Sequence, residues 1–135
     1  MSVIIESSAL GSLVKNEDTA DTVREVREHA LSVYVPVHCL LEITLAKRLP
    51  DHRHDYMERL LNVDGVTTIG VAPDCWPIMR DAARRYGKGA GHPAKLNFGD
   101  CLSYAVSKQR GVPLLFVGLD FIHTDGASAI DWTTA

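Results

Sequence analysis

The sequence has no long hydrophobic run and few cysteines, and both absences narrow its class. No apolar stretch approaches the roughly 20 residues that span a bilayer, and no basic-then-apolar leader opens the chain. The three cysteines, Cys39, Cys75 and Cys101, are an odd number at wide spacings, which disfavours a disulfide framework and indicates a reducing compartment. We therefore expect a soluble, cytoplasmic protein whose cysteines lie in its core.

Positive charge is not in excess either. The sequence has 14 Lys and Arg against 17 Asp and Glu, for a net charge of -3, so an overall basic field cannot draw in nucleic acid. Any contact with nucleic acid must then be local. Apolar residues are plentiful, at 46% of the 135 residues, which is enough to predict one compact domain over residues 1–135.

Strand and helix patterns alternate along the chain. Short apolar runs predict strands at residues 3–5, 33–35 and 112–117, a strand or extended connector at 63–69, and a last short strand at 129–132. Apolar residues at helical spacing predict helices at 19–30, between Pro36 and Pro50, and at 51–61, 72–86 and 98–109. Ser7 or Ser8 can cap a further helix after the first strand. This order predicts an α/β fold, a three-layer α/β/α domain with a mainly parallel central sheet.

Four acidic residues from distant segments are expected to meet. Glu6 and Asp120 follow predicted strands, Asp100 lies in the first turn of a buried helix, and Glu42 lies within a helix. Ligands of open parallel sheets bind beyond the carboxyl ends of the strands, because successive crossovers leave a crevice there. The sequence therefore predicts an acidic site in that crevice.

Such a group of acids needs a cation. Two carboxylates about 4 Å apart repel by about 4 kcal/mol at an effective dielectric near 20. Oxygen ligands favour Mg²⁺ or Mn²⁺ over zinc. A bound divalent ion can activate a water molecule and polarise a scissile phosphate, so no side-chain nucleophile is required.

Each acid also has a purely structural interpretation. Asp100 in a first helical turn is stabilised by the helix dipole alone. Glu42 can lie at the edge of an apolar stripe with its carboxylate in solvent, and Asp120 can be an ordinary loop acid after a strand.

Several motifs point to one known family. Residues 85–89 (RYGKG), 92–94 (HPA) and 96–101 (LNFGDC) resemble the VapC branch of the PIN-domain family. The opening 4–10 (IIESSAL), the pair 41–42 (LE) and the closing 120–125 (DFIHTD) are similar to further motifs of that family. The resemblance extends over nearly the whole chain.

The resemblance implies a Mg²⁺- or Mn²⁺-dependent endoribonuclease that halts translation as the toxin of a type II toxin-antitoxin system, with a VapB-type antitoxin as partner. It implies four catalytic acids, which are Glu6, Glu42, Asp100 and Asp120. As metal ligands it implies Glu6 and Asp100, together with Asp120 or Asp125 as the remaining acid. Ser8 and Thr124 would support these acids by hydrogen bonds.

Two positions depart from the family pattern. Where the family has Asp this chain has Glu6, whose extra carbon–carbon bond of about 1.5 Å is large against metal–ligand tolerances. Leu119 stands where many relatives have another acid. The alternative function is therefore a catalytically weakened PIN-fold interaction module, which binds its antitoxin without cutting RNA.

Four basic residues surround the loop before Asp100 and are candidates for binding RNA phosphates: Arg84, Arg85, Lys88 and Lys95. An ordinary solvated helix end is an equally good interpretation of this cluster. Met57, Leu60 and Leu61 are expected to pack in the core or at the surface of a homodimer.

Overall fold

A single parallel sheet organises the molecule. The computed structural model describes residues 1–46 and 49–130. Its strands are β1 (Ser2–Ile5), β2 (Ser32–Pro36), β3 (Val66–Ile69) and β4 (Leu114–Leu115). They pair in the order β3-β2-β1-β4, and each pair is parallel. The predicted α/β class with a parallel sheet is confirmed, and residues 63–69 contain a true strand.

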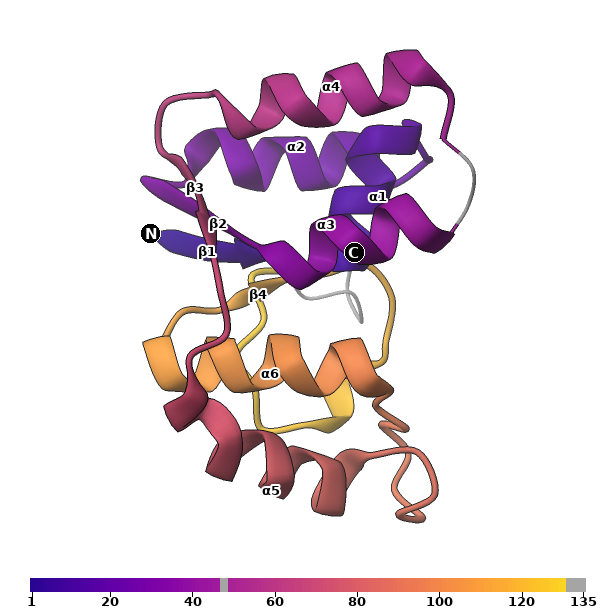
Figure 1. The fold of residues 1–135 in the computed structure, drawn as a ribbon, viewed down its shortest axis with the longest axis vertical. Coiled ribbons are helices and arrows are strands. Elements are labelled where there is room, and N and C mark those ends of the chain that lie inside the picture. The colour runs from indigo at the N-terminus through magenta and orange to yellow at the C-terminus, as the bar shows by residue number, and fades with distance from the viewer. Residues whose placement is uncertain (47–48, 131–135) are drawn as a thin grey trace.

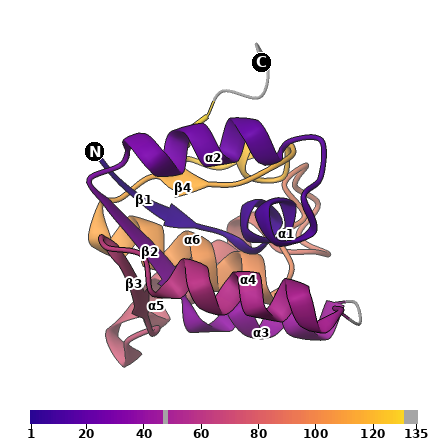
Figure 2. The same cartoon turned by 90° about the horizontal axis from the view of Figure 1, so that it is seen from above.

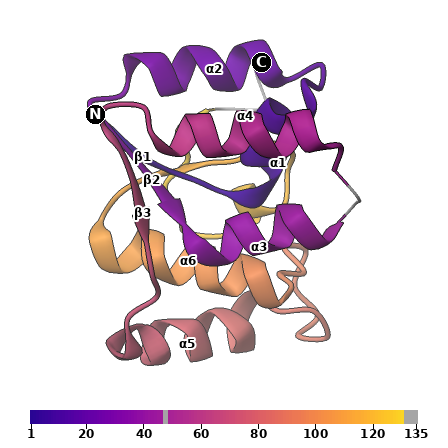
Figure 3. The ribbon, with the colours of Figure 1, turned by 45° about the horizontal axis from the view of Figure 1, so that its top comes forward.

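Helices cover both faces of this sheet. In chain order they are α1 (Ser7–Lys15), α2 (Ala20–His29), α3 (Val37–Ala46), α4 (Asp51–Leu61), α5 (Trp76–Tyr86) and α6 (Phe98–Arg110), with short 3₁₀ turns η1 (Pro73–Cys75) and η2 (Phe121–His123). Figure 1 shows α1, α2 and α4 on one side of the sheet and α5 and α6 on the other. Figure 2, seen from above, separates α2 from α4, and Figure 3 shows α3 beside the far end of the strands.

Two hydrophobic cores lie back to back across the sheet. Along β1 the side chains alternate, so Val3 and Ile5 enter the core under α1, α2 and α4, whereas Ile4 enters the core against α5 and α6. All three of these side chains have no exposed surface. The β1 strand is therefore buried on both faces, as its continuous β-branched run predicts.

The fourth strand is shorter than the sequence predicts. Of the predicted strand 112–117, only Leu114 and Leu115 pair with β1. Pro113 has no N–H to donate, although its carbonyl accepts from the backbone N–H of Ile4 at 3.0 Å. On its other side Leu114 forms a single bridge to Ser128. The predicted strand 129–132 is not formed at 129–130, and residues 131–132 lie outside the described part of the chain.

Some predicted core residues lie elsewhere. Cys39 and Cys75 are buried, but Cys101 is only partly buried; all three thiols are free. Met57 and Leu60 pack in the core, with Leu61 partly buried against it. The side chains of α3 differ, because Val37, Leu41 and Leu45 are all more than half exposed and form an apolar stripe on its outer side. No helix within the described residues is both long and apolar enough to cross a membrane.

Candidate functional site

Glu6 lies at the point where β1 runs into α1. Its Oε2 accepts hydrogen bonds from the backbone N–H of Ser8 at 2.9 Å and from the Ser8 hydroxyl at 2.5 Å. Glu6 is therefore the N-cap of α1, and the prediction that Ser7 or Ser8 caps this helix is wrong. The extra methylene of Glu lets the side chain curl back onto the first turn, which short capping side chains reach directly.

Burial makes the charge on Glu6 unfavourable. Only 4% of the residue is exposed, and this desolvation raises the pKa of the Glu6 carboxyl to about 7. The charges of Asp100 and Glu42 raise it further, while the two hydrogen bonds from Ser8 oppose the shift. These interactions place Glu6 in the same electrostatic group as Asp100 and Glu42.

Glu42 reaches the site from α3, the helix that follows β2. The hydroxyl of Ser7 donates to its Oε1 at 2.8 Å. The carboxylate lies directly against the backbone of Gly99 in α6, where an added Cβ would be only 2.5 Å from either oxygen. A side chain at position 99 would displace the Glu42 carboxylate, so the glycine there lets the acid lie against α6.

Asp100 is fixed by the N-terminus of α6. Its Oδ2 accepts from the backbone N–H of Asn97 at 3.0 Å, and Asn97 Oδ1 accepts from the backbone N–H of Asp100 at 2.9 Å. This capping box satisfies two N–H groups at once. The structural role predicted for Asp100 is thus present, and it sets the direction of the side chain.

The environment of Asp100 is crowded with negative charge. Burial raises the pKa of the Asp100 carboxyl, and the charges of Asp120 and Glu42 add to this effect. The hydrogen bond from Asn97 and the positive charge of Lys88 act in the opposite direction. Asp120 itself is exposed and precedes η2. The four predicted acids thus form one interacting group, although no three of them bring ligand atoms within 4.8 Å of one another among the described residues.

Asp125 does not join the acids. Its Oδ1 accepts from the hydroxyl of Tyr104 at 2.5 Å, and its Oδ2 lies 3.4 Å from the Lys108 ammonium and 3.8 Å from the Arg85 guanidinium. The hydrogen bond from Tyr104 lowers the pKa of Asp125, with Lys108 and Arg85 contributing. These contacts turn Asp125 toward α5 and α6, and the charge that acts on Asp100 is that of Asp120.

The two predicted supporting residues have different positions. Ser8 donates to Glu6 and accepts from the backbone N–H of Val117 at 2.9 Å, so it connects the site to the segment after β4. Thr124 instead donates to the carbonyl of Phe121 at 2.7 Å and accepts from the N–H of Gly126 at 3.1 Å. Its contacts shape the loop that contains Asp120 and do not reach a carboxylate.

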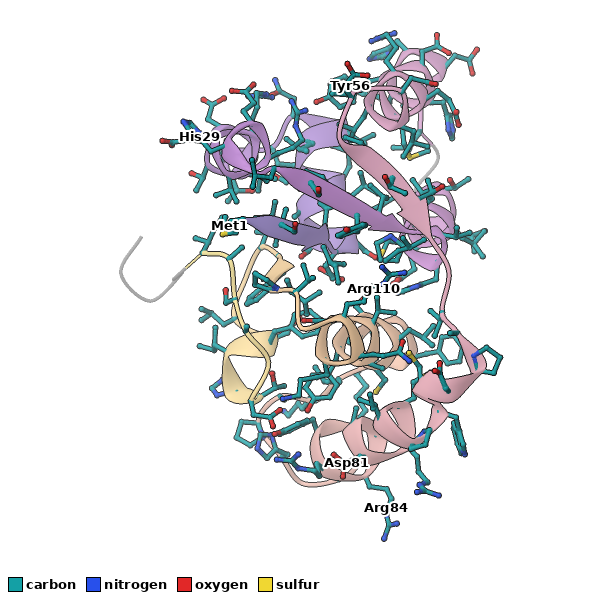
Figure 4. All side chains as sticks on the ribbon, turned by 90° about the vertical axis from the view of Figure 1, so that its left-hand side faces the viewer. Met1, His29, Tyr56, Asp81, Arg84 and Arg110 are labelled. Carbon is teal, nitrogen blue, oxygen red and sulfur yellow. The ribbon has the colours of Figure 1, made fainter. Side chains whose placement is uncertain are left out.

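The two lysines and the two arginines of the predicted basic cluster have different positions. Lys88 and Lys95 line a hollow of about 510 Å³ in the loop before α6. Arg85 is paired with Asp81 at 3.2 Å and lies over the ring of Tyr86. Arg84 points away from the body of the protein, as its label in Figure 4 shows. Of the four, Lys88 is the one whose charge acts on Asp100.

Sequence reasoning missed three residues near the acids. Ser7 orients Glu42, and Gly99 makes room for it. The third is His38, whose Nε2 lies 2.9 Å from the Ser103 hydroxyl. His38 stands one helical turn before Glu42, and this spacing is the signal that would have found it.

A hard divalent ion fits this site by its chemistry. The four acids offer oxygen atoms only, which Mg²⁺ and Mn²⁺ prefer. Their mutual repulsion contributes to the raised pKa values of Glu6 and Asp100, and a cation would relieve it. A cavity of about 560 Å³ lined by Ser7, Ser8 and Glu42 opens between α1 and α3, so solvent reaches the acids from that side.

Comparisons with known proteins agree on one family. The family model described as "PIN domain" matches residues 3–127. Ribonuclease VapC42 of Mycobacterium tuberculosis is 35% identical over 125 residues, which cover 91% of this chain and 95% of the relative.

Two solved structures have the same fold at low sequence identity. VapC20 of Mycobacterium tuberculosis, a Sarcin-Ricin loop cleaving toxin, superposes with a TM-score of 0.73 at 16% identity, over 93% of this chain and 96% of the other. VapBC2 of Rickettsia felis, bound to a DNA fragment from its promoter, superposes with a TM-score of 0.72 at 8% identity, over 95% and 96%.

Proposed function

This chain belongs to the PIN-domain family, in its branch of VapC ribonucleases, and from that premise we propose that it is a divalent-metal-dependent endoribonuclease. In this proposal Mg²⁺ or Mn²⁺ is the cofactor, and the chain is the toxin of a type II toxin-antitoxin system that acts in the cytoplasm. The observation that carries the proposal is the meeting of Glu6, Glu42, Asp100 and Asp120 from four distant segments, with the pKa values of Glu6 and Asp100 raised.

In this proposal each of the four acids has its own role. Glu42, oriented by Ser7, and Asp100, oriented by Asn97, would hold the ion, each from its own helix. Asp120 approaches Asp100 from the loop after β4 and completes the acidic rim. When bound, the ion supplies an activated water and charge stabilisation at the phosphate. Glu6, whose pKa is raised by the charges of Asp100 and Glu42 as well as by burial, would add negative charge that favours the ion once it is ionised.

The RNA backbone is held from the loop before α6. Lys88 and Lys95 are exposed and line the same hollow, and the charge of Lys88 acts on Asp100. A lysine so close to the acids can bind the phosphate adjacent to the cleaved bond, despite the net charge of -3. Arg85 is already occupied by Asp81 and Asp125, so we assign it a smaller part.

Two protein partners belong to the proposal. The similarity to VapBC2, which contains an antitoxin by name, supports a VapB-type antitoxin as the partner of this chain. A homodimer is supported by the apolar stripe of Val37, Leu41 and Leu45 along the outside of α3, since exposed apolar patches commonly mark interfaces.

Cleavage assays test the function. The purified chain is incubated with transfer RNA, ribosomal RNA and a sarcin–ricin loop oligonucleotide, in the presence of Mg²⁺, Mn²⁺ or a chelator. We expect endonucleolytic products only with a divalent ion, and none from the Asp100→Asn variant, which retains an oxygen for the capping box. If neither the wild type nor Asp100→Asn cleaves RNA with any of these metals, the proposed endoribonuclease activity is refuted.

The second candidate is an interaction module without catalysis. It is favoured by one observation, that the Glu6 carboxylate is committed to capping α1 through Ser8. The Glu6→Asp variant separates the two candidates, because the shorter acid matches the family pattern. If the wild type is inactive and Glu6→Asp cleaves RNA, Glu6 is the cause of the lost activity. If the wild type itself cleaves RNA, the non-catalytic candidate is rejected.

A further inference from the structure

The start of α3 carries a second group of metal-binding side chains. His38, Cys39 and Glu42 each offer one ligand atom, and these atoms lie within 4.8 Å of one another. Within the described residues, no other set of three His, Cys, Asp or Glu side chains comes so close. The group differs from the acidic site in kind, because it combines a nitrogen, a sulfur and an oxygen.

The spacing of the first two ligands suits one ion. Cys39 Sγ lies 3.5 Å from His38 Nε2. Two ligands of a tetrahedral zinc ion, at about 2.3 Å for sulfur and 2.0 to 2.1 Å for nitrogen, would lie about 3.6 Å apart. The hydroxyl of Ser103 stands beside both, at 2.9 Å from Nε2 and 3.6 Å from Sγ. For the pair to share a cation, that hydroxyl must give way and the buried Cys39 thiol must lose its proton.

The bonding of the His38 ring is incomplete. Its Nδ1 is buried and has no hydrogen-bond partner among the described residues, which costs free energy in a metal-free protein. A histidine that binds a metal through one ring nitrogen donates from the other to an outer partner, and Nδ1 of His38 is the nitrogen left for that role.

The two neighbouring sites differ in the metals they prefer. Thiolate and imidazole ligands select zinc-like ions, whereas the four acids select Mg²⁺ or Mn²⁺. Glu42 belongs to both, because its charge acts on Glu6, Asp100 and His38 alike. An ion that engages Glu42 from the His38 side competes with one that engages it from the acidic side.

We propose that His38, Cys39 and Glu42 bind a thiophilic divalent ion such as Zn²⁺, and that this ion withdraws Glu42 from the acidic site and inhibits RNA cleavage. The inhibitory part rests on the proposed nuclease function, whereas the binding part does not. On binding, the Cys39 thiol releases its proton to solvent and Ser103 gives up its hydrogen bond to Nε2. The ion remains divalent throughout, so no electron transfer is involved.

Cobalt provides a readout that is independent of activity. The reduced, metal-free chain is titrated with Co²⁺, which replaces Zn²⁺ in such sites and reports thiolate ligation by a charge-transfer absorption band. We expect one equivalent to give this band and one equivalent of Zn²⁺ to abolish it. Cys39→Ser removes the band, and His38→Gln weakens Co²⁺ binding about 100-fold or more, because even outer partners of a ligand are worth 10- to 100-fold.

Cys101→Ser is the matched control, since Cys101 is a free thiol outside the group, and it keeps the band. If the buried Cys39→Ser variant does not fold, His38→Gln decides the question, because its ring is only partly buried. A band that survives in Cys39→Ser, or the absence of stoichiometric Co²⁺ and Zn²⁺ binding, overturns the proposal. His38, Cys39 and Ser103 would then be a hydrogen-bonded contact between α3 and α6.

Inhibition is measured separately, with each variant's cleavage rate in Zn²⁺ divided by its own rate in Mg²⁺ alone. We expect one equivalent of Zn²⁺ to lower the wild-type ratio at least tenfold and the His38→Gln ratio by less than twofold. Tight zinc binding without any effect on the rate would overturn the inhibitory part. A chain that cleaves nothing in any metal refutes the nuclease function, while the cobalt spectrum still decides whether the zinc site exists.

Discussion

Glu6 at the start of α1 and Asp100 in the first turn of α6 both place a carboxylate at the positive end of a helix, and both accept a backbone N–H there. The two junctions, β1–α1 at Glu6 and the start of α6 at Asp100, differ in how unfavourable the negative charge of the carboxylate is. The Glu6 carboxylate takes two donors on one oxygen, is almost fully buried and has no cation among the causes that shift its pKa. Asp100 is less buried, and Lys88 offsets part of the negative charge around it.

The comparison shows how the position of an acid in a helix cap sets its direction. Asp100 is the N3 residue of its capping box, and its carboxylate reaches back to the N–H of Asn97 while the charges of Asp120 and Glu42 act on it. Glu6 is itself the N-cap, and its carboxylate reaches forward to Ser8. Helix capping therefore fixes the direction of both carboxylates.

The largest effect should follow from giving Asp100 the length of Glu6. We expect Asp100→Glu to lower kcat/KM for RNA cleavage about 100-fold, because a displacement near 1 Å at a reacting centre costs that much. Cleavage at saturating Mg²⁺ measures it. The reciprocal Glu6→Asp variant is the control and should not lose activity. A fully active Asp100→Glu protein would show that length does not distinguish the two junctions.

The pH dependence of stability should reveal the buried charge of Glu6. Its pKa is about 7 in the folded chain against the ordinary 4.5, so the folded state binds the proton more tightly than the unfolded state. The stability that this group contributes is fully present below the ordinary pKa and is lost as the pH rises through about 7.

Glu6→Gln should remove that loss, so in chelator we expect the variant to exceed the wild type by about 3 kcal/mol near pH 8 and to match it near pH 4. Urea unfolding at both pH values gives the comparison. Parallel stability curves for the two proteins would mean that Glu6 is not the group responsible.

A smaller effect is expected when the cap of α6 is removed. Asn97→Ala deletes the acceptor of the Asp100 backbone N–H and should lower the free energy of unfolding by about 1 kcal/mol. Asn97→Asp keeps an acceptor of equal quality and should change it little. Thermal unfolding of the three proteins tests this, and equal losses in both variants would contradict a capping role.

The smallest effect should come from Lys88, the cation that only the α6 junction has. Lys88→Gln should reduce the slope of log binding constant against log salt by about 1, as loss of one phosphate contact predicts. RNA binding is measured by filter binding in chelator across a range of salt. Arg84→Gln, at an exposed position that points away from the protein, is the matched control and should leave the slope unchanged.

The fold was largely readable from the sequence because the signals that set it are local. The β-branched run of β1 and the apolar spacing of α6 report burial directly. The length of β4 could not be predicted, because a strand extends only as far as its neighbour offers backbone to pair with. In β1 only Ile4 and Ile5 pair with β4. The outward direction of Leu41 and Leu45 was not readable either, since an apolar stripe does not say which neighbour covers it.

The four candidate acids could be named from the sequence, but their contacts could not. The carboxylate of Asp125 accepts from the hydroxyl of Tyr104, a residue of α6. Ser8, which donates to Glu6, accepts from Val117, far along the chain. Such contacts exist only once the sheet has formed, so no spacing in the sequence encodes them.

The contact between Gly99 and the Glu42 carboxylate has a consequence for how this protein can vary. A methyl group at position 99 would take the space of the Glu42 carboxylate, so the flexible Glu42 side chain would have to turn aside and give up the hydrogen bond from Ser7. The fold could accept Gly99→Ala, but the acid would no longer rest where it does. The smallest residue of α6 thus fixes the resting position of a carboxylate that belongs to a different helix.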